Sequence, residues 1–576
     1  MSMFTLQTLG LILLFGLLGL LVGWFIRSFF CKPSASGPAS KVVGNADTPV
    51  KAPLNTAADN TSNIAADTPV TTTAATGVVD TVSNVASEAL DTAAGAADNA
   101  IASTNNVGVA VGAAGAGTAA AAAAAYSIST SVNDQQEDAR QLRTEAEALL
   151  SENFATDAPD GVSHIIIGAG PAGIIAAETI RKLDSKAIIT VIGDEPEAPY
   201  SRMAIPYFLE ENIQAEGTHL RKTQDHYENA DIQILSGRVK SVDTQNKQVE
   251  TANGLTLDYD KLLIATGSHP LTPPIPGLDN AKVGNCWDLA DSRKIIENVK
   301  PGASVVQIGA GFIGCIILEA LVKRGAKLTV VEMDNRMVPR MLDEQCGGML
   351  KNWCESKGVT VLTETQVKSI EDNGERIKVN LSKGEAIDAD YVISATGVAS
   401  NTQFLKGSGI DIDQGVLVNH FLETNIPDVY AAGDVAQGVD FTTGGYSVHA
   451  IQPTAADHGI ICAKNMVKGN QTRHKGSLQM NILSTLDLIS TSYGAWEGVE
   501  GGEHTELVDT DKYRYIRLQF KDDRLVGANT LGITQNIGAL RGLIQSKTKL
   551  GVWKDRLMDN PLHFMDAYVA ITGNHT

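Results

Sequence analysis

The sequence is poor in cysteine and in positive charge. Its 576 residues include six cysteines, and no two of them form a C-x-x-C pair, so their spacing predicts neither a metal site nor a disulfide framework. Lysines and arginines number 46 against 66 aspartates and glutamates, so the formal net charge of −20 argues against a nucleic-acid partner. Such cysteine usage is typical of a protein in a reducing, cytoplasmic-type compartment.

Charge is also absent near the start of the chain. Residues 3–26 carry no charged side chain, and residues 9–26 are almost entirely Leu, Ile, Val, Phe and Gly, a length that suits a membrane-spanning helix. Because the basic residues Arg27 and Lys32 follow this run, an uncleaved anchor is favoured over a signal peptide, with the following chain in the cytoplasm. We predict a transmembrane anchor at residues 1–32 and a single-pass membrane protein with a cytoplasmic body.

Aromatic residues are almost absent from the next hundred positions. Small and polar residues dominate there, and such a chain cannot bury enough apolar surface to offset the entropy of ordering. We predict a low-complexity tether over residues 33–160, with a short helix at 134–150. One alternative stays open: residues 107–128 are uncharged and include seven consecutive alanines, and a second membrane span there would place the body on the opposite side.

A glycine-rich motif follows the tether, in the stretch HIIIGAGPAGIIAAE at 164–178. In a dinucleotide fold the first glycine permits a tight strand-to-helix turn, the second lets a pyrophosphate approach the backbone, and the third lets helix and strand pack closely. A second apolar strand at 187–192 leads to Asp194 and Glu195, where a ribose-binding carboxylate is expected. The candidate pyrophosphate-binding residues are Gly168, Gly170, Pro171, Ala172 and Gly173.

The same glycine spacing recurs between an apolar strand at 304–308 and a further strand at 328–331. Two dinucleotide sites in one chain indicate a flavin paired with a nicotinamide. Glu332 closes the second unit, and its carboxylate would bind a ribose diol and repel a 2′-phosphate, so NADH is predicted over NADPH. The candidate residues of this site are Gly309, Gly311, Phe312, Ile313, Gly314 and Glu332.

The pattern changes near residue 476. From about residue 161 to that point, β-type and helical segments alternate, which predicts parallel sheets with crossover helices. Beyond it, strands are expected at 480–489 and 513–520 and helices at 538–545 and 553–568, which together predict a separate α+β domain.

Five stretches resemble the two-dinucleotide FAD/NAD(P)-dependent pyridine-nucleotide oxidoreductases, which include rubredoxin and ferredoxin reductases, the flavin module of nitrite reductase and apoptosis-inducing factor. These stretches are GAGPAG at 168–173, PYSR at 199–202, YDKLLIATG at 259–267, GAGFIG at 309–314 and TNIPDVYAAGD at 424–434. The resemblance covers about residues 162–570. It implies an α/β fold of two Rossmann-like domains plus a C-terminal domain, with the NAD domain inserted into the FAD domain. The implied FAD-binding domain is thus split into two segments, 161–284 and 398–476, with the NAD-binding domain at 285–397 between them and an interface domain at 477–576.

The resemblance also assigns roles to single residues. It implies that Asp194 and Glu195 lie by the adenosine ribose of FAD, that Arg202 contacts FAD, that Val239 backs the adenine and that Asp434 holds the ribitol. The remaining cofactor-binding positions carried over are Ala265, Thr266, Gly267, Gly397 and Gly433.

A helix expected to begin near residues 452–455 would direct its N–H groups toward the flavin's pyrimidine edge, where a reduced flavin is anionic. His449 and His458 flank this helix, and a proton relay through either is kept as an alternative.

The sequence departs from its relatives at three positions beside the expected flavin. Met203 replaces the cysteine of disulfide reductases, and because a thioether forms no thiolate, disulfide and cysteine-peroxide chemistry are not expected. Tyr207 and Ile316 replace a lysine–glutamate pair of the rubredoxin reductases, which leaves the orientation of the nicotinamide open. Cys315 begins a helix, where a packing role is favoured over a redox role.

We therefore predict a membrane-anchored FAD-dependent NAD(P)H oxidoreductase that needs no catalytic side chain. It would take hydride from NADH and pass electrons to a separate rubredoxin-like, ferredoxin-like or haem protein, or to a quinone. One alternative is an FAD- and NADH-binding docking or sensing flavoprotein with little turnover. Another is the flavin component of a nitrite-reductase-type system. The C-terminal domain could also mediate a homodimer.

Overall fold

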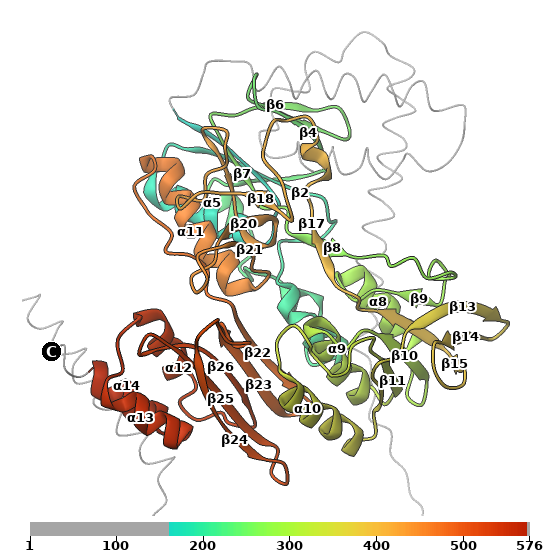
Figure 1. Ribbon diagram of the computed structural model, residues 1–576. Coiled ribbons are helices and arrows are strands. Elements are labelled where there is room, and N and C mark those ends of the chain that lie inside the picture. Colours follow the sequence, from blue (N-terminus) through green and yellow to red (C-terminus); the bar gives the residue numbers. More distant parts are fainter. Residues whose placement is uncertain (1–160, 573–576) are drawn as a thin grey trace, which may run out of the picture. The chain divides into compact units, whose positions relative to one another are not determined.

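The computed structural model describes residues 161–572 (Figure 1). The predicted anchor at 1–32, the tether at 33–160 and its helix at 134–150 lie outside the described residues. Within the described range no helix is long and apolar enough to cross a membrane. The longest helix of that range, α11 (Gln452–Lys468), has 17 residues and carries Lys464 within it, whereas a span needs about 20 apolar residues. This finding contradicts the predicted single-pass membrane localisation, which we withdraw.

The first parallel sheet has the strand order β19-β7-β1-β2-β3. Its central strand, β1 (Ser163–Ile167), pairs in parallel with both neighbours, and Ile165, Ile166 and Ile167 are buried. Such a continuous apolar run suits a strand that is covered on both faces. The other strands are β2 (Ile188–Gly193), β3 (Gln233–Ser236), β7 (Lys261–Ile264) and β19 (Val429–Ala431).

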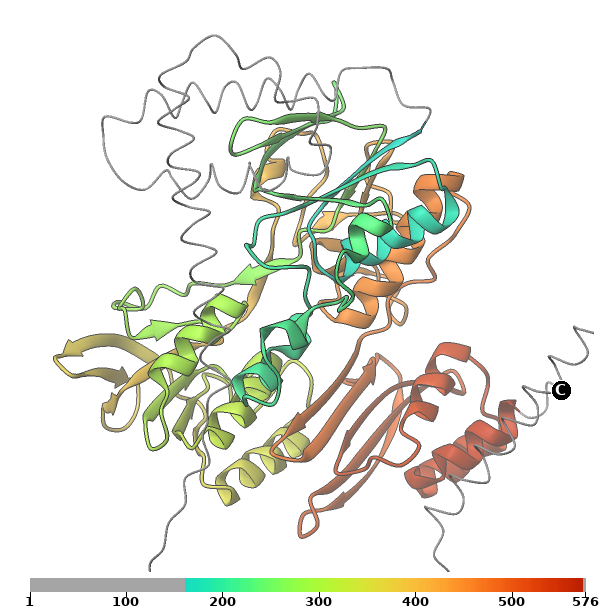
Figure 2. The same cartoon turned by 180° about the vertical axis from the view of Figure 1, so that it is seen from behind.

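Two helices far apart in sequence lie side by side on this sheet: α5 (Pro171–Leu183) and α11, drawn in cyan and orange (Figures 1 and 2). They approach closely because Gly459 of α11 has no side chain; a Cβ there would lie 2.5 Å from the carbonyl oxygen of Ala172. Smaller elements complete this region: β4 (Val239–Asp243), β5 (Gln248–Thr251), β6 (Thr256–Asp258), β18 (Val416–Leu417), β20 (Ala436–Val439), β21 (Tyr446–Val448) and α7 (His226–Asn229). Helix α6 (Ile205–Leu209) packs instead in the core of the second parallel-sheet region.

The second parallel sheet has the order β12-β11-β10-β16-β9 and repeats the strand–helix–strand plan of the first. The expected strand at 304–308 coincides with β10 (Ser304–Ile308). The other elements are β9 (Val283–Gly284), β11 (Lys327–Val331), β12 (Thr360–Leu362), β16 (Tyr391–Ser394), α8 (Leu289–Asn298), α9 (Phe312–Lys323), α10 (Glu344–Ser356), and the antiparallel β13 (Val367–Asn373), β14 (Arg376–Leu381) and β15 (Ile387–Ala389). The chain passes between the two parallel sheets along β8 (Ser268–Pro270) and β17 (Val398–Ser400), which pair antiparallel.

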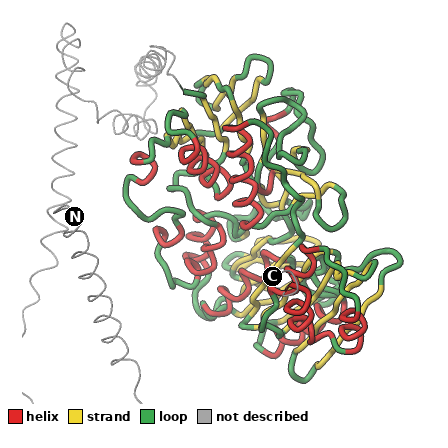
Figure 3. Tube along the Cα trace, turned by 90° about the vertical axis from the view of Figure 1, so that its left-hand side faces the viewer, coloured by secondary structure: helices red, strands yellow, loops and turns green. Residues whose placement is uncertain are grey.

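The C-terminal region is an antiparallel sheet of five strands with helices that follow it in the chain (Figure 3). The strands in sheet order are β22 (Met480–Thr485), β23 (Leu488–Gly494), β26 (Arg524–Leu531), β25 (Arg514–Lys521) and β24 (Glu503–Asp509). The helices are α12 (Gly538–Ser546), α13 (Val552–Asp559) and α14 (Phe564–Thr572). This sheet contacts the second parallel unit: Tyr515 donates a hydrogen bond of 2.6 Å to Asp343, and the backbone N–H of Leu486 donates one of 2.9 Å to Glu319.

Two expectations for this region were wrong. The single strand expected at 480–489 is a hairpin, because Leu486 and Asp487 take positive φ values of 51° and 69° and form a two-residue turn between β22 and β23. The single helix expected at 553–568 breaks at Asn560, whose side chain accepts from the N–H of Leu562 and caps a new turn that begins at Pro561. The strands β24 and β26 were not expected at all.

Candidate functional site

A cavity of about 700 Å³ opens among the two parallel-sheet regions and the C-terminal sheet. Residues from both glycine-rich motifs line it, and so do Met480, Asn481 and Ile482 of β22. The predicted site residues that line this cavity are Gly168, Gly170, Pro171, Ala172, Asp194, Glu195, Arg202, Ala265, Thr266, Gly267, Phe312, Ile313, Gly433 and Asp434. The predicted site residues that do not line it are Gly173, Val239, Gly309, Gly311, Gly314, Glu332 and Gly397.

A second cavity of about 280 Å³ adjoins the first. Gly168, Asp194 and Thr266 line both cavities, so the two lie next to each other at the first glycine-rich loop. Val239, predicted to back an adenine, lines this smaller cavity together with Phe404. Both cavities lie at the carboxyl ends of β1 and β2, which is where ligands bind in open α/β sheets.

The three glycines of each motif have different surroundings. A Cβ on Gly168, at φ +114°, would lie 2.1 Å from the carbonyl oxygen of Ala265, and one on Gly173 would lie 2.0 Å from that of Gly168. A Cβ on Gly170, by contrast, would meet nothing within 4 Å. The first and third glycines are therefore required by close backbone packing, while the second leaves open space in front of its backbone.

The two helices that follow the glycine motifs begin without a side-chain cap. Gly170 precedes α5 and Gly311 precedes α9, and neither helix start accepts or donates a capping side-chain bond. Helix α11, which begins beside the cavity, is also uncapped. Asp288, in contrast, caps α8 by accepting from the N–H of Asp291. The uncapped N–H groups and the positive ends of these helix dipoles make the cavity a suitable site for phosphate groups.

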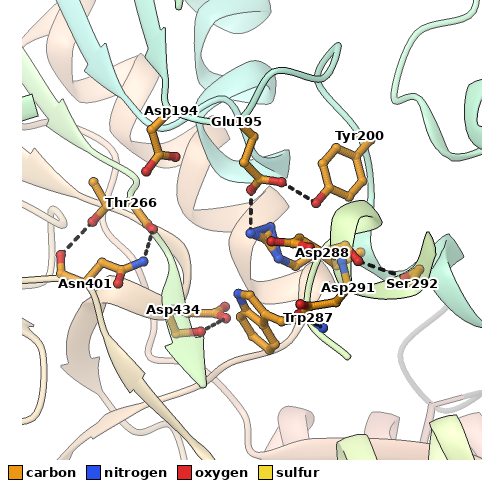
Figure 4. Close-up of polar contacts among 12 residues, drawn as sticks. Asp194, Glu195, Tyr200, Thr266, Trp287, Asp288, Asp291, Ser292, Asn401 and Asp434 are labelled. Carbon is orange, nitrogen blue, oxygen red and sulfur yellow. Dashed lines mark hydrogen bonds and ion pairs between the residues drawn. The ribbon is translucent and has the colours of Figure 1, made fainter. Parts of the chain in front are cut away.

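Two carboxylates that follow β2 each pair with an arginine. Glu195 accepts from Arg202 at 2.6 Å and from the Tyr200 hydroxyl at 2.5 Å (Figure 4). Asp194 accepts from Arg238 at 2.9 Å. Arg238 was not among the predicted site residues, because nothing in its local sequence marks it. These pairs hold both carboxylates at the edge of the cavity.

Arg202 is held by aromatic rings as well as by charge. Its guanidinium carbon lies 5.1 Å from the ring centroid of Trp287 and 5.7 Å from that of Tyr200, within the range of cation–π contacts. Its Nε is buried and has no hydrogen-bond partner within the described chain. A buried donor of this kind is costly to leave unpaired, so the site suits an acceptor such as a phosphate or hydroxyl oxygen.

Asp434 has a single side-chain partner. Its carboxylate accepts one hydrogen bond of 2.9 Å from the Ser268 hydroxyl (Figure 4). Burial raises the pKa of the Asp434 carboxyl above its usual value. The remaining acceptor positions of this carboxylate suit a ligand with hydroxyl donors. Ser268 was missed by the sequence analysis, although it directly follows the first ATG motif.

Glu332 lies outside the cavity lining. It is 5% exposed, and its carboxylate accepts from the backbone N–H of Ala310 at 2.6 Å and from that of Asp334 at 2.9 Å. The carboxylate thus braces the second glycine-rich loop from behind the strand end. Each of its two carboxylate oxygens thus accepts one backbone hydrogen bond.

Two reciprocal hydrogen bonds join Thr266 and Asn401, which flank β8 and β17, the strand pair that links the two parallel sheets. Asn401 donates to the carbonyl oxygen of Thr266 at 2.8 Å, and the Thr266 hydroxyl donates to that of Asn401 at 2.9 Å (Figure 4). A second contact joins Ser201 to Gln452, with 2.5 Å between the hydroxyl and the amide oxygen. Sequence reasoning missed Asn401 because its partner is 135 residues away.

The three residues that differ from those of the related reductases do not all lie at the cavity. Met203 lines the cavity and is half exposed, and Ile316 lines it as well. Tyr207 is 57% exposed and is not among the lining residues. The cavity wall beside the second motif is therefore apolar, formed by Phe312, Ile313 and Ile316.

Thiol chemistry has little support in this cavity. Among the described residues, Cys286 is the one cysteine that lines it, and burial raises the pKa of its thiol to about 12. Cys315 is fully buried, donates to the carbonyl oxygen of Ala310 at 3.5 Å, and has a raised thiol pKa from burial. Both side chains stay protonated at neutral pH, and reactive cysteines require a thiolate.

The two histidines kept as alternative proton relays do not line the cavity. His449 lies 3.2 Å from Asp440 and 2.9 Å from the Ser447 hydroxyl. His458 is buried between α11 and the chain that leads into β22, and it is not among the lining residues. Neither imidazole is placed to exchange protons with a ligand in the cavity.

Comparison with known proteins places this architecture. Residues 162–456 match the family described as pyridine nucleotide-disulphide oxidoreductase. The NADH-dependent phenylglyoxylate dehydrogenase subunit epsilon of Aromatoleum evansii is 29% identical over 401 residues, which cover 69% of this chain and 95% of that protein. The ferredoxin–NAD(+) reductase component of the biphenyl dioxygenase system of Paraburkholderia xenovorans is 32% identical over 272 residues, 47% of this chain and 66% of that protein.

A solved structure has the same fold. The putidaredoxin reductase–putidaredoxin complex aligns with a TM-score of 0.66 over 71% of this chain and 99% of that chain, at 21% sequence identity. At this identity the likeness shows the fold alone, which is the predicted α/β fold with Rossmann-like units.

Proposed function

The chain belongs to the pyridine nucleotide-disulphide oxidoreductase family and is an FAD-dependent NAD(P)H oxidoreductase, and we propose that it takes electrons from NADH and delivers them singly to an iron–sulfur protein of the ferredoxin or rubredoxin type. The observation that carries this proposal is the shared cavity, which residues of both glycine-rich motifs line together. A donor and a cofactor bound at the two motifs would meet there.

The residues around the first motif fit FAD. The open space at Gly170 and the uncapped start of α5 suit the pyrophosphate. The unpartnered Nε of Arg202 suits an oxygen acceptor, and the single-partner carboxylate of Asp434 suits the ribitol hydroxyls. We propose that Val239, in the adjoining cavity, backs the adenine. Asp194 and Glu195 would lie by its ribose.

The second motif fits NADH better than NADPH. We propose that Gly311 faces the pyrophosphate and that Glu332 accepts from the adenosine ribose. The nearest basic side chain after Glu332, that of Arg336, already donates to the carbonyl oxygens of Leu342 and Pro339, at 2.8 and 3.1 Å. The guanidinium is therefore already hydrogen-bonded within its own loop. A 2′-phosphate would be repelled by the Glu332 carboxylate, and the positive charge of Arg336 would not be placed to offset that repulsion.

Bound FAD would supply the redox chemistry, because a flavin accepts two electrons together and gives them up one at a time. The protein's part is to bind, orient and exclude water. The apolar wall at Phe312, Ile313 and Ile316 would keep water from the transfer site. The start of α11, which also lines the cavity at Gln452, would stabilise negative charge on a reduced flavin.

The acceptor is proposed from relatives and from the cavity. One relative is named as a ferredoxin–NAD(+) reductase component, a name that pairs NAD with an iron–sulfur protein, and another is named as a subunit of an NADH-dependent dehydrogenase. Disulfide substrates are disfavoured because Met203 replaces the expected cysteine and the thiol of Cys286 is protonated.

The test uses the full chain loaded with FAD under anaerobic conditions. NADH is mixed with catalytic amounts of the protein and either a [2Fe–2S] ferredoxin or a rubredoxin, and the visible absorbance of the acceptor is followed. We expect the acceptor to be reduced, and we expect reduction at sub-saturating NADH to slow by ~10-fold in Gly311→Ala, which keeps the FAD site and impairs only the binding of NADH. NADH oxidation only in air, with no acceptor reduced anaerobically, would contradict the proposal.

A second candidate is a flavoprotein that binds NADH with little turnover. Supporting it, no lysine is among the cavity-lining residues, and Tyr207 and Ile316 occupy the positions of the lysine–glutamate pair. Slow or absent flavin reduction by NADH, with both ligands bound, would favour this candidate over the first.

A further inference from the structure

His458 lies behind the proposed FAD site at a point where three segments meet. It sits on α11 next to Gly459, the residue that lets this helix approach α5, and it is 2% exposed. Buried histidines of this kind need partners for both ring nitrogens.

The hydrogen bonds of His458 determine its tautomer. The backbone N–H of Gly433 lies 3.3 Å from Nδ1, and because a backbone N–H only donates, Nδ1 must be the acceptor. Nε2 therefore carries the proton, and it donates to the Ser477 hydroxyl at 3.0 Å. The ring of His474 packs edge-on against it with centroids 4.9 Å apart.

These contacts set the direction of one peptide unit. The peptide between Ala432 and Gly433 is trans, so its carbonyl points away from the N–H that His458 accepts. Ala432, Gly433 and Asp434 all line the main cavity. Gly433 has φ +74° and no side chain, so its backbone would reorient easily if the acceptor were lost.

The other ring nitrogen bonds to Ser477, in the chain that leads into a second wall of the cavity. Ser477 pairs with Val439 and Phe441 through backbone hydrogen bonds of 2.9 Å each, and it stands three residues before β22. The residues Met480 to Ile482 at the start of β22 line the cavity. One imidazole thus joins the backbone beside Asp434 to the chain that carries this wall.

We propose that His458 is a positioning residue of the FAD site: by accepting from Gly433 it fixes the Ala432–Gly433 peptide, one residue before Asp434, and by donating to Ser477 it ties that peptide to the chain that leads into β22. The inference rests on the proposed binding of FAD at Asp434. Burial and the neighbouring His474 and His449 lower the pKa of His458 to about 3, so the neutral form that this bond pattern needs persists at physiological pH.

Four variants of the full chain separate the two bonds. In His458→Asn the amide oxygen replaces Nδ1, so the acceptor for Gly433 is kept, whereas His458→Gln places its amide at the Nε2 position and keeps only the partner of Ser477. His458→Leu keeps neither. Ser477→Ala removes the hydroxyl and leaves the Gly433 bond intact.

We expect His458→Leu and His458→Gln to raise the Kd for FAD by ~10-fold, the factor that corresponds to the loss of one buried hydrogen bond. The same two variants should shift the flavin's visible spectrum and reduction potential. His458→Asn and Ser477→Ala should stay within about threefold of the wild-type Kd. Because Asn and Gln differ by one methylene, their comparison holds even where the Leu variant does not fold.

The wild type is measured first. A wild-type chain that binds no FAD would overturn the proposed function and this inference together. Wild-type binding with the same Kd, spectrum and potential in the Asn and Gln variants would overturn this inference alone.

Discussion

The loops Gly168–Gly173 and Gly309–Gly314 share glycine spacing and backbone course, but the acids after their second strands have different surroundings. Glu195 bonds only to side chains, Tyr200 and Arg202, and lines the cavity. Glu332 is buried and bonds only to backbone N–H groups, one of them within its own glycine loop.

The shared features come from local backbone requirements. In both loops the first glycine takes a positive φ and a Cβ would collide with a carbonyl oxygen, that of Ala265 for Gly168 and that of Ala395 for Gly309. The second glycine faces open space in both. The differing acids depend on partners from other segments. A motif therefore determines a loop, while the surrounding fold determines what its acid does.

The largest expected effect separates folding from binding within one loop. Gly168→Ala should lower the free energy of unfolding by ~3–5 kcal/mol, because its methyl group would meet a carbonyl oxygen at a positive φ. The matched control Gly170→Ala, at φ −76° and in open space, should change it by less than about 1 kcal/mol. Chemical denaturation of the FAD-free chains measures both. Equal destabilisation would contradict the assigned division of roles.

The next prediction compares the two acids directly. Glu332→Gln should destabilise the chain by ~2 kcal/mol, because two buried backbone donors lose a charged acceptor. Glu195→Gln should cost less than about 1 kcal/mol, since its ion pair with Arg202 is partly exposed to solvent. The denaturation midpoints of the two variants, measured under the same conditions, show which substitution lowers the free energy of unfolding more. A larger loss for Glu195→Gln would reverse the comparison.

A third experiment tests which loop serves which cofactor. A methyl group on the second glycine would block the approach of a pyrophosphate, so Gly170→Ala should raise the Kd for FAD at least ~10-fold. Gly311→Ala should leave FAD bound and raise the KM for NADH by a similar factor. FAD content and steady-state kinetics report the two effects. The opposite pattern would exchange the assignments.

The smallest predicted change in stability concerns Asp434, an acid with one partner. Burial raises its pKa, so at neutral pH its charged form opposes folding of the FAD-free chain. Asp434→Asn should therefore stabilise that chain at pH 7 by up to ~1 kcal/mol. The gain should vanish as the pH falls below the ordinary pKa of aspartate, where the carboxyl is neutral in both the folded and unfolded states.

The same substitution should weaken FAD binding, because an amide is a poorer acceptor for ribitol hydroxyls. Thermal unfolding across pH, with and without FAD, measures both effects. A variant less stable without FAD at neutral pH, or one that binds FAD as tightly as the wild type, would contradict the role given to Asp434.

Much of the fold could be predicted because its signals are local. The strand at 304–308 and the helix after Gly170 follow from apolar runs and glycine spacing. The hairpin turn at Leu486–Asp487 could not, because it lacks the usual Asn-Gly or Asp-Gly signal. The break before Pro561 should have been expected from the proline itself.

The site was predictable only in some of its residues. Gly168, Asp434 and their neighbours belong to motifs, whereas Arg238, Trp287 and Asn401 contribute through contacts between distant segments that no local pattern encodes. The predicted membrane localisation was wrong: it rested on the apolar run at residues 3–26, and no helix between residues 161 and 572 is long and apolar enough to cross a membrane.

The proposed function depends above all on one step, in which NADH bound at the second motif reduces FAD bound at the first. To follow this step, the FAD-loaded full chain is mixed anaerobically with NADH, and separately with NADPH, in a stopped-flow instrument that records the flavin's visible absorbance. We predict rapid bleaching with NADH and bleaching at least ~10-fold slower with NADPH at equal concentration. An FAD-loaded chain that NADH leaves oxidised, or that NADPH reduces faster, would contradict the proposed function.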